Sequence, residues 1–380
     1  MNFHQTIELY QKKINKALEQ FFNDLYSKNN DPLQRKYIEM MKEFTLRKGK
    51  RLRPILVIIA FNGLQTLNNK TTNNKTLNSN NTNNKTLNNK TTKNNPQDTQ
   101  INSDLLNVAL TTELLESFFL IHDDIIDNSD LRRGKLSIHK QFEQHYNKAT
   151  AQSLALLVGD LMASQALLPI FNSNIEPTIK NNLLHKVQQI IIQTNYGQIQ
   201  DLLLLQTPIN QVSEEQILAI YQEKTARYTL EGPLQLGAIA ATASRETLQS
   251  LSKVALPLGV AFQLRDDILG LFGTVEKIGK PIDSDIKEGK KTLLILKALE
   301  TTSVKNRKFL IACLGNQKVT SNDLQQIRQI VIDSDSLNYS QQLIHSLITK
   351  AKEELAKITL NQESKDFLIA LADYIAAREN

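Results

Sequence analysis

The chain has 380 residues, with 13 glycines, 9 prolines and no tryptophan, so it can bury a large core and its composition favours helices over strands. Its single cysteine, Cys313, excludes a disulfide framework and a Cys/His zinc site, and such cysteine usage fits a reducing cytoplasm. The net charge of +6 does not indicate nucleic-acid binding, because residues 64–103 alone carry five lysines against one aspartate and no basic stripe with interleaved aromatic residues is visible.

The N-terminal part predicts three helices. Residues 1–48 have the spacing of two amphipathic helices, separated by the turn sequence at residues 29–32. A basic segment at residues 49–54 precedes a largely apolar helix at residues 55–64. The N-terminus lacks the apolar block of a signal peptide, and the longest apolar run, residues 54–61, is too short to span a bilayer. We therefore expect a cytoplasmic protein without a membrane span.

An insertion rich in asparagine, threonine and lysine extends from about residue 65 to residue 103. The unit Asn-Asn-Lys-Thr recurs there, beginning at residues 68, 73, 83 and 88. Isolated leucines cannot bury enough surface to offset the entropy of ordering, so we expect a disordered segment between two helices. An expanded neutral loop and a functional tether both remain open, and without a secretory signal the Asn-x-Thr triplets do not indicate glycosylation.

An acidic motif behind an apolar run is the most informative stretch of the sequence. Asp123 and Asp127 are four residues apart, so on a helix they share one face. Close carboxylates on a buried face repel each other and need a cation, and carboxylate oxygens suit Mg²⁺. Arg132 and Arg133 follow, and guanidinium groups match phosphate oxygens. The stretch therefore predicts a site for Mg²⁺ and a diphosphate.

Helical spacing continues through the rest of the chain. Helices are predicted at residues 104–130, 147–169, 181–205, 233–243 and 248–259. A capping box at Ser213 opens a further helix, which carries Lys224 and Thr225 and is predicted to end near residues 232–233.

A second acidic pair follows. Asp266 and Asp267 come after Gln263, and residues 278–292 form a charged loop that contains glycine. Residues 293–380 predict more amphipathic helices, and no segment alternates strongly enough to predict a strand. We therefore expect an all-α fold in one domain with a central helical core.

The ordered set of motifs resembles the trans-isoprenyl diphosphate synthases of the polyprenyl synthetase family, of the short-chain farnesyl or geranylgeranyl diphosphate synthase type. The motifs lie at residues 49–54, 123–134, 197–201, 224–225, 262–267 and 279–292. The resemblance implies one all-α prenyltransferase domain over residues 1–380, a helical bundle of the isoprenoid synthase type around a central cavity, interrupted by the insertion. It also implies condensation of isopentenyl diphosphate with an allylic diphosphate, three Mg²⁺ ions per active site, and a homodimer.

The resemblance also assigns roles to residues. The metal ligands would be Asp123, Asp124, Asp127, Asp266 and Asp267. Arg132 would contact the allylic diphosphate, whereas Lys50, Arg53 and Arg133 would bind isopentenyl diphosphate. The allylic site would be lined by Lys224, Thr225, Gln263, Lys280 and Lys290, of which Lys224, Thr225 and Gln263 would also help to stabilise the carbocation.

Two positions depart from the family pattern. The second acidic motif often ends in a third aspartate, but Gly270 stands there, and Asp285 is a candidate helper from a distant position. A histidine that contacts isopentenyl diphosphate often lies seven residues before the first aspartate, but Glu116 stands there. These departures imply fewer protein ligands and more waters at one metal ion, and an isopentenyl diphosphate site without the histidine of the family.

Product length can be argued from helix geometry. Phe119 lies four residues before Asp123, so the two share a helix face about 5.4 Å apart along the axis, and Phe118 lies beside it. A chain growing from the aspartates would meet these rings, which predicts a short product, C15 in preference to C20. Ordinary core packing of both rings remains the alternative.

Three other interpretations stay open. Loss of the third aspartate at Gly270 would suit a catalytically silent partner subunit, although the intact first motif speaks against it. A class I terpene cyclase would share the acidic motifs but would not need Lys50, Arg53 and Arg133 for a second diphosphate. A metal phosphohydrolase would use His122 beside Asp123, but it would need further histidines in a fitting acidic context.

Overall fold

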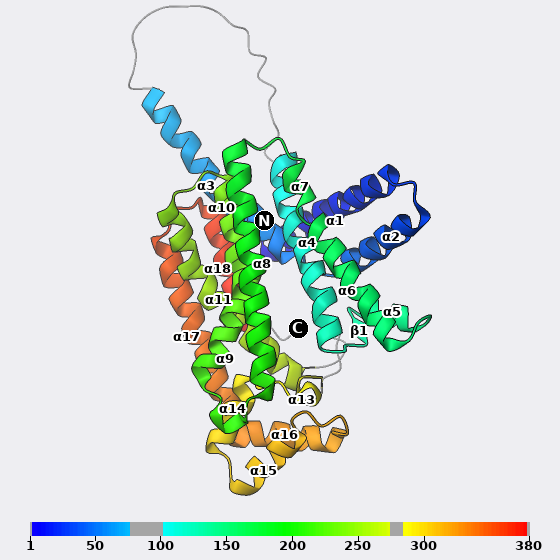
Figure 1. Ribbon diagram of the computed structural model, residues 1–380. Coiled ribbons are helices and arrows are strands. Elements are labelled where there is room, and N and C mark those ends of the chain that lie inside the picture. The colour runs from blue at the N-terminus through cyan, green and yellow to red at the C-terminus, as the bar shows by residue number, and fades with distance from the viewer. Residues whose placement is uncertain (1, 77–101, 274–283, 378–380) are drawn as a thin grey trace, which may run out of the picture.

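The computed structural model describes residues 2–76, 102–273 and 284–377, with the backbone alone for residues 66–76. Its elements, in chain order, are α1 (Phe3–Lys28), α2 (Pro32–Leu46), α3 (Leu52–Thr76), α4 (Ser103–Ile126), β1 (Leu131–Arg132), β2 (Lys135–Leu136), α5 (Ile138–Glu143), α6 (Lys148–Gln165), α7 (Leu168–Phe171), α8 (Pro177–Gln206), the 3-10 turn η1 (Ile209–Gln211), α9 (Glu214–Ile220), the π-helix η2 (Tyr221–Glu231), α10 (Gly232–Ala240), α11 (Arg245–Phe272), α13 (Ser284–Glu288), α14 (Leu293–Thr301), α15 (Val304–Cys313), α16 (Ser321–Asp333), α17 (Ser336–Lys357) and α18 (Gln362–Ala377) (Figure 1). The predicted all-α fold is confirmed.

The N-terminal helices follow local signals. The Asp31 side chain accepts hydrogen bonds from the backbone N–H groups of Leu33 and Gln34, and Pro32 occupies the first helical position of α2, so the chain breaks where the sequence predicts. The helix predicted at residues 55–64 is longer, because α3 runs from Leu52 to Thr76 and includes the first part of the polar segment. Residues 77–101, most of the predicted insertion, lie outside the described residues.

Helix α4 is buried along most of its length and carries the first acidic motif at its C-terminal end. It packs against α3, α6 and α10. The helix ends at Ile126 with Asp127 as its C-cap, and a short hairpin of β1 and β2 follows. These two-residue strands are the described exception to the expectation of no strands. Arg133 and Gly134 form the turn between them with φ angles of 54° and 78°.

The helix predicted to end near residues 232–233 does not end there. The segments α9, η2 and α10 follow one another without a loop, and residues 221–231 form π-helical turns. Two glycines let neighbouring helices approach η2 closely. A Cβ at Gly197 of α8 would lie 2.4 Å from the backbone nitrogen of Lys224, and one at Gly259 of α11 would lie 2.3 Å from Cβ of Ala226. The π-helix is therefore held between α8 and α11.

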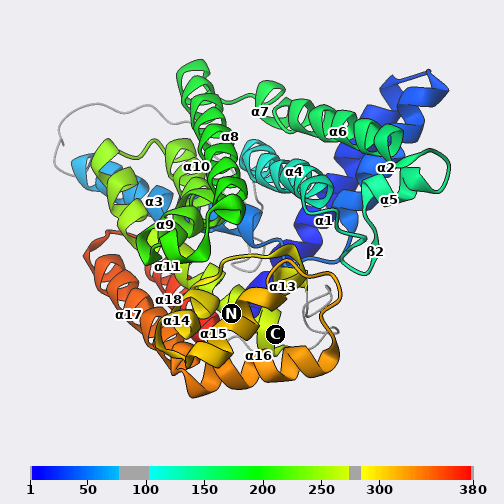
Figure 2. The same ribbon diagram turned by 60° about the horizontal axis from the view of Figure 1, so that its bottom comes forward.

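Helix α11 forms the opposite wall of the core. It extends unbroken from Arg245 to Phe272, with Pro257 inside it, and so joins the predicted helix at residues 248–259 to the second acidic motif. It packs most extensively against η2 and α17. Helices α14, α15 and α16 lie together at one end of the molecule, close to α13, as Figure 2 shows. Both acidic motifs are thus on helices that reach the same end of the bundle (Figures 1 and 2).

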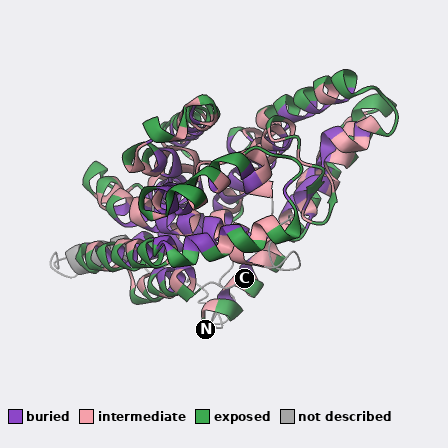
Figure 3. Ribbon diagram, turned by 90° about the horizontal axis from the view of Figure 1, so that it is seen from below, coloured by how far each residue is buried: buried purple, intermediate pink, exposed green. Residues whose placement is uncertain are grey.

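Burial follows the helical periodicity of the sequence. Buried residues form the inner faces of the helices, and exposed residues lie on the outer faces (Figure 3). Two described stretches are long and apolar enough to cross a membrane by length and composition alone, Ser103–Ile126 and Lys148–Phe171. The first has 67% of its apolar window buried in the fold and is a core helix, whereas the second has only 39% buried. This is weak evidence for a span, as core helices pass the same test.

Candidate active site

A cavity of about 470 Å³ lies among α4, α8, η2 and α11. Its lining includes Asp123 from the first acidic motif and Asp266 and Asp267 from the second. Other lining residues predicted from the sequence are Arg53, Phe118, Phe119, Lys224, Thr225, Gln263 and Lys290. The fold therefore brings the two motifs, which are far apart in the sequence, to one cavity.

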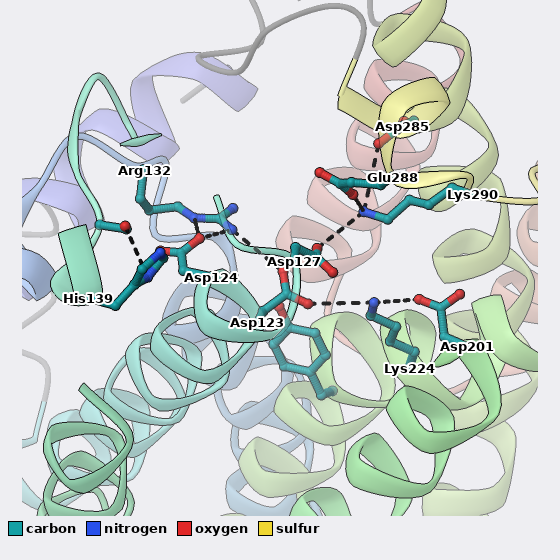
Figure 4. A network of polar contacts seen from close by, with 12 residues as sticks. Asp123, Asp124, Asp127, Arg132, His139, Asp201, Lys224, Asp285, Glu288 and Lys290 are labelled. Carbon is teal, nitrogen blue, oxygen red and sulfur yellow. Dashed lines mark hydrogen bonds and ion pairs between the residues drawn. The ribbon is translucent and has the colours of Figure 1, made fainter. Parts of the chain in front are cut away.

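Two acids of the first motif, Asp123 and Asp127, lie beside lysines from other elements (Figure 4). Lys224 of η2 places Nζ 3.6 Å from Oδ1 of Asp123, and Lys290 places Nζ 3.3 Å from Oδ2 of Asp127. Burial opposes the charge of each lysine, but the surrounding carboxylates raise the pKa of both above the ordinary value. These lysines therefore stay charged and supply positive charge where the sequence predicts metal ions.

Asp124 points away from Lys224 and Lys290 and toward Arg132 (Figure 4). It is fully buried, and Nε of Arg132 donates to its Oδ1 at 2.8 Å (Figure 4). Burial opposes the charge of Arg132, but Asp124, followed by Asp123 and Asp127, raises the pKa of the guanidinium. In this arrangement Asp124 orients Arg132 beside Asp123, whose Oδ2 lies 3.5 Å from Nη2 of Arg132. The metal role of Asp124 stays a prediction.

The second motif is built from carboxylates and neutral donors. Nε2 of Gln263 donates to Oδ1 of Asp267 at 2.9 Å, and the hydroxyl of Tyr221 donates to Oδ2. Burial raises the pKa of Asp267 to about 8, and repulsion from Asp285 and Asp266 adds to the shift. Such crowding of acids is a physical reason for a cation here.

Asp285 lies where the family pattern would have a third aspartate. A Cβ built on Gly270 would come 2.6 Å from Oδ2 of Asp285, so the carboxylate of α13 fills the space that a side chain at Gly270 would enter. The same carboxylate lies 3.7 Å from Nζ of Lys290. The candidate helper named from the sequence is therefore at the cavity and not at a distance from it.

Several residues at the cavity were not part of the predicted set. Asp201 of α8 accepts from Nζ of Lys224 at 2.7 Å, and Tyr221 and Tyr228 of η2 also line the cavity. Asp201 belongs to the motif at residues 197–201, so its presence in that motif was the available signal. The hydroxyl of Thr225 donates to Oε1 of Gln263 at 2.8 Å, which joins two predicted residues.

The predicted contacts for isopentenyl diphosphate are partly assembled. Arg53 and Arg133, called here the arginine pair, both contact Glu116 at 2.9 Å. The exposed Lys50 donates to the hydroxyl of Tyr374 in α18 and lies over its ring. Lys280 lies outside the described residues, so its predicted role stays a prediction.

Two phenyl rings form part of the cavity wall. Phe118 and Phe119 lie with ring centroids 4.8 Å apart, and Phe119 meets the edge of Tyr228 at 5.1 Å. Phe118 packs against His122 at 4.9 Å. His122 is the one histidine in the described lining of the cavity, and its Nε2 lies 3.6 Å from Asp160, so the constellation of a multi-histidine phosphohydrolase is not assembled there.

The donor set can hold a hard cation only with help from other ligands. Within the described residues, no group of three or more acids, histidines or cysteines lies close enough to chelate a metal ion by itself. Mg²⁺ commonly takes one or two carboxylates and completes its shell with waters and substrate phosphates. The carboxylates of Asp123 and Asp266 line one cavity together with Lys224 and Lys290, and the pKa of Asp267 is raised. These features fit that pattern.

Comparisons with known proteins identify the family of the chain. Residues 34–331 match the family model described as polyprenyl synthetase. The chain is 33% identical over 279 residues to a short chain isoprenyl diphosphate synthase of Methanocaldococcus jannaschii, covering 72% of this chain and 79% of the relative. It is 32% identical over 275 residues to a geranylgeranyl diphosphate synthase of Saccharolobus solfataricus, covering 71% and 79%.

A solved structure shares the whole fold. The geranylgeranyl pyrophosphate synthase of Corynebacterium glutamicum, in complex with isoprenyl diphosphate and magnesium, superposes with a TM-score of 0.84 at 25% identity and covers 100% of both chains. The fold class predicted from the sequence, an isoprenoid synthase bundle around a cavity, is confirmed by this similarity. The chain therefore belongs to the polyprenyl synthetase family and is a prenyltransferase.

Proposed function

We propose that the protein condenses isopentenyl diphosphate with an allylic diphosphate, dimethylallyl, geranyl or farnesyl, and releases pyrophosphate and a short all-trans prenyl diphosphate. The observation that carries the proposal is the placement of Asp123 and Asp266 in the wall of one cavity, from two different helices. Two acidic groups that face a shared space suit a metal-bound diphosphate better than either motif does alone.

The allylic half of the site would organise the leaving group. In the reaction, the C–O bond of the allylic diphosphate breaks, pyrophosphate leaves with the electron pair, and a carbocation remains. Bound Mg²⁺, for which we expect three ions on Asp123, Asp124, Asp127, Asp266 and Asp267, supplies charge neutralisation at the leaving diphosphate. Arg132, Lys224 and Lys290 are charged and would add hydrogen bonds to the same oxygens.

The cation must be protected until the new bond forms. The double bond of isopentenyl diphosphate attacks the allylic carbon, and a proton is then lost from the adjacent carbon, with pyrophosphate as the available base. Thr225 and Gln263 are joined by a hydrogen bond on the cavity wall and present dipoles to the reacting carbons. Phe118 and Phe119 exclude water, which would otherwise quench the cation.

The arginine pair supports a two-substrate reaction over a terpene cyclase. Arg53 lines the cavity, and Arg133 shares the acceptor Glu116 with it, so two guanidinium groups lie together outside the acidic motifs. A cyclase holds only one diphosphate and has no use for this second basic group. Lys50 lies just before α3, the helix that carries Arg53, and would join the arginine pair when isopentenyl diphosphate binds.

Product size would be set by the phenyl rings. Phe119 is one turn before Asp123 on α4 and meets the ring of Tyr228 on η2, so a chain that grows from the acidic motifs would run into these two rings. This supports a C15 product in preference to C20. The relatives named above include enzymes for geranylgeranyl diphosphate, which makes C20 the competing outcome.

A homodimer would cover the apolar face of α6 and α8. Helix α6 exposes Leu156 at 47%, Leu157 at 57% and Leu161 at 43%, and α8 exposes Tyr196 at 62% and Leu203 at 63%. These helices occupy one outer edge of the molecule in Figure 2. Large exposed apolar side chains on adjacent surfaces are typical of a protein interface. This face also gives a reason, other than a membrane span, for the apolar composition of Lys148–Phe171. The cytoplasm remains our expected location, in keeping with the buried free thiol of Cys313.

The test is a direct assay of condensation. The purified protein is incubated with Mg²⁺, radiolabelled isopentenyl diphosphate and, in separate reactions, dimethylallyl, geranyl or farnesyl diphosphate, and the products are sized after dephosphorylation. We expect a C15 alcohol as the main product and no product when EDTA removes the metal. Absence of any elongated product with all three primers would contradict the proposed function, and cyclic hydrocarbons would favour the cyclase.

A further inference from the structure

One carboxylate oxygen joins both members of the arginine pair. Oε1 of Glu116 lies 2.9 Å from Nη1 of Arg53 and 2.9 Å from Nη2 of Arg133. The side chains of Glu116 and Arg53 are 12% and 13% exposed, and both residues line the cavity. Because two guanidinium groups share one acceptor, their separation and their orientation are fixed together.

The other contacts of the arginine pair are neutral. Nη2 of Arg53 donates to Oγ1 of Thr229 at 3.0 Å, and its guanidinium lies 4.2 Å from the ring centroid of Tyr228. Nη1 of Arg133 donates to the backbone oxygen of Arg47 at 3.4 Å. Among the described ion pairs, Glu116 is the one acid in contact with either arginine.

Glu116 keeps its charge in this environment. Burial opposes ionisation, but Arg53 and Arg133 hold the pKa of the carboxyl below its usual value. Glu113 lies one turn earlier on α4 and forms its own ion pair with Arg51, so it does not replace Glu116 at the arginine pair. The pocket that would receive the diphosphate of isopentenyl diphosphate therefore contains a resident negative charge.

We propose that Glu116 is a positioning residue that orients the arginine pair and weakens the binding of diphosphates to it. The inference rests on the proposed function, because it takes the arginine pair as the site for isopentenyl diphosphate. An incoming diphosphate shares the two guanidinium groups with the carboxylate and is repelled by it. The prenyl diphosphate product keeps the diphosphate of isopentenyl diphosphate and meets the same repulsion, so Glu116 favours its release and limits its inhibition of the next cycle.

The decisive variant is Glu116→Gln. The amide oxygen of glutamine can accept from both arginines, so the geometry survives while the negative charge is removed. We expect the KM for isopentenyl diphosphate to fall by roughly three- to tenfold, as one repulsive charge at a partly desolvated site is worth about one tenfold step. The inhibition constant of the prenyl diphosphate product, measured in competition with isopentenyl diphosphate, should fall by a similar factor. The KM for the allylic diphosphate should change by less than about twofold, because the acidic motifs are untouched.

A second variant separates charge from geometry. Glu116→Asp keeps the charge but is too short to reach both arginines, so the KM for isopentenyl diphosphate should rise by a few-fold. The KM for isopentenyl diphosphate should thus fall in Glu116→Gln and rise in Glu116→Asp. A merely structural role of Glu116 would not give opposite shifts. The matched control is Glu214→Gln on α9, which removes a partly buried carboxylate 2.8 Å from Lys297 and outside the cavity lining. Both KM values should stay at the wild-type level there.

Failure of the inference and failure of the proposed function give different results. If the wild-type protein condenses the substrates but Glu116→Gln leaves the KM for isopentenyl diphosphate unchanged or raises it, Glu116 does not weaken diphosphate binding. If Glu116→Gln folds poorly, an unchanged KM in Glu116→Asp overturns the inference equally well. If the wild-type protein forms no product, the proposed function itself is wrong.

Discussion

The C-terminal ends of α4 and α11 face the same cavity, but they neutralise their acids in different ways. Asp124 and Asp267 are each the second aspartate of an acidic pair, and both are buried. Asp124 accepts from the charged Arg132, whereas Asp267 accepts from the neutral Gln263 and Tyr221. Burial raises the pKa of Asp267 to about 8, which is a measure of how costly its charge is there. The α11 end therefore gains more from an added cation.

Within each motif, one acid is held by neighbouring side chains of the fold and another faces the cavity. In the first motif, Asp123 lines the cavity beside Lys224, Asp127 contacts Lys290, and Asp124 accepts a hydrogen bond from Arg132. In the second motif, Asp266 and Asp267 both line the cavity, and Asp267 also accepts hydrogen bonds from Gln263 and Tyr221. We therefore expect substitutions of Asp124 and Asp267, the anchoring acids, to act mainly on the fold, and substitutions of Asp123 and Asp266, the cavity acids, to act mainly on the bound ligand. Substitutions at matched positions of the two helices test this division.

The largest effect is expected at a cavity acid. Asp123→Ala should lower the turnover number by about a thousandfold or more, because the charge that would hold the metal and orient Lys224 is removed. Product formation is measured with saturating substrates, and circular dichroism shows whether the variant folds. Asp373→Ala on α18, which breaks a surface contact with Lys352 on α17, is the control and should keep normal turnover. Near-normal turnover of Asp123→Ala would remove its metal role.

The anchoring acids should differ in their effect on stability. Asp124→Asn leaves the guanidinium of Arg132 buried without its main counter-charge, and we expect a loss of about 3 kcal/mol in the free energy of unfolding. Asp267→Asn keeps one oxygen that can accept from either Gln263 or Tyr221, and it replaces a carboxyl whose raised pKa already disfavours the charge, so its loss should stay under about 1 kcal/mol. Urea unfolding in the presence of EDTA measures both. Equal losses would mean that the two helix ends are held in the same way.

We expect apolar side chains of α4 to set the length of the product, whereas those at the end of α11 should have no effect on it. Phe119→Ala removes the ring that meets Tyr228, so the product should lengthen by at least one C5 unit. Sizing of the products with geranyl diphosphate as primer gives the answer. Phe272→Ala, at the end of α11 and outside the described cavity lining, is the comparison and should leave product length unchanged. An unchanged distribution in Phe119→Ala would make the ring an ordinary core residue.

The smallest effect is expected at the substitute for the third aspartate. Asp285→Asn removes a carboxylate that contacts Lys290 and fills the space beside Gly270. We expect the Mg²⁺ concentration for half-maximal activity to rise by a few-fold, since water can replace one weak ligand. A titration of activity with Mg²⁺ at fixed substrate measures it. If that midpoint does not shift, Asp285 does not act as a metal ligand, and Asp266 and Asp267 are the only acids of the second motif that serve the metal.

Local signals in the sequence predicted local structure well. Asp31 and Pro32 mark the start of α2, and the capping box of Ser213 with Gln216 starts α9, because caps depend on residues three or four positions apart. The π-helix η2 was not predictable in this way. Its conformation goes with the close approach of α8 at Gly197 and α11 at Gly259, which are contacts between distant parts of the chain.

The site shows the same contrast between features that local sequence predicts and contacts that depend on distant parts of the chain. The spacing of the acidic motif predicted that Asp123 belongs to the site, and the family resemblance implied the same of Lys224; both line the cavity, 3.6 Å apart between Nζ of Lys224 and Oδ1 of Asp123. Motif spacing could not predict that Asp124 turns toward Arg132, because that choice depends on the hairpin of β1 and β2 that follows α4. Nor could it predict that Glu116 bridges the arginine pair, since Arg53 reaches it from another helix.

The most direct test of the central claim is calorimetric binding of pyrophosphate in the presence of Mg²⁺ to a double-mutant cycle of Asp123→Asn and Asp266→Asn. If the two acids act on one metal-bound diphosphate, either single variant should abolish most of the metal-dependent affinity, and the double variant should be little worse than each single variant. If the two losses simply add, or if neither variant changes the affinity, the acidic ends of α4 and α11 do not form one site.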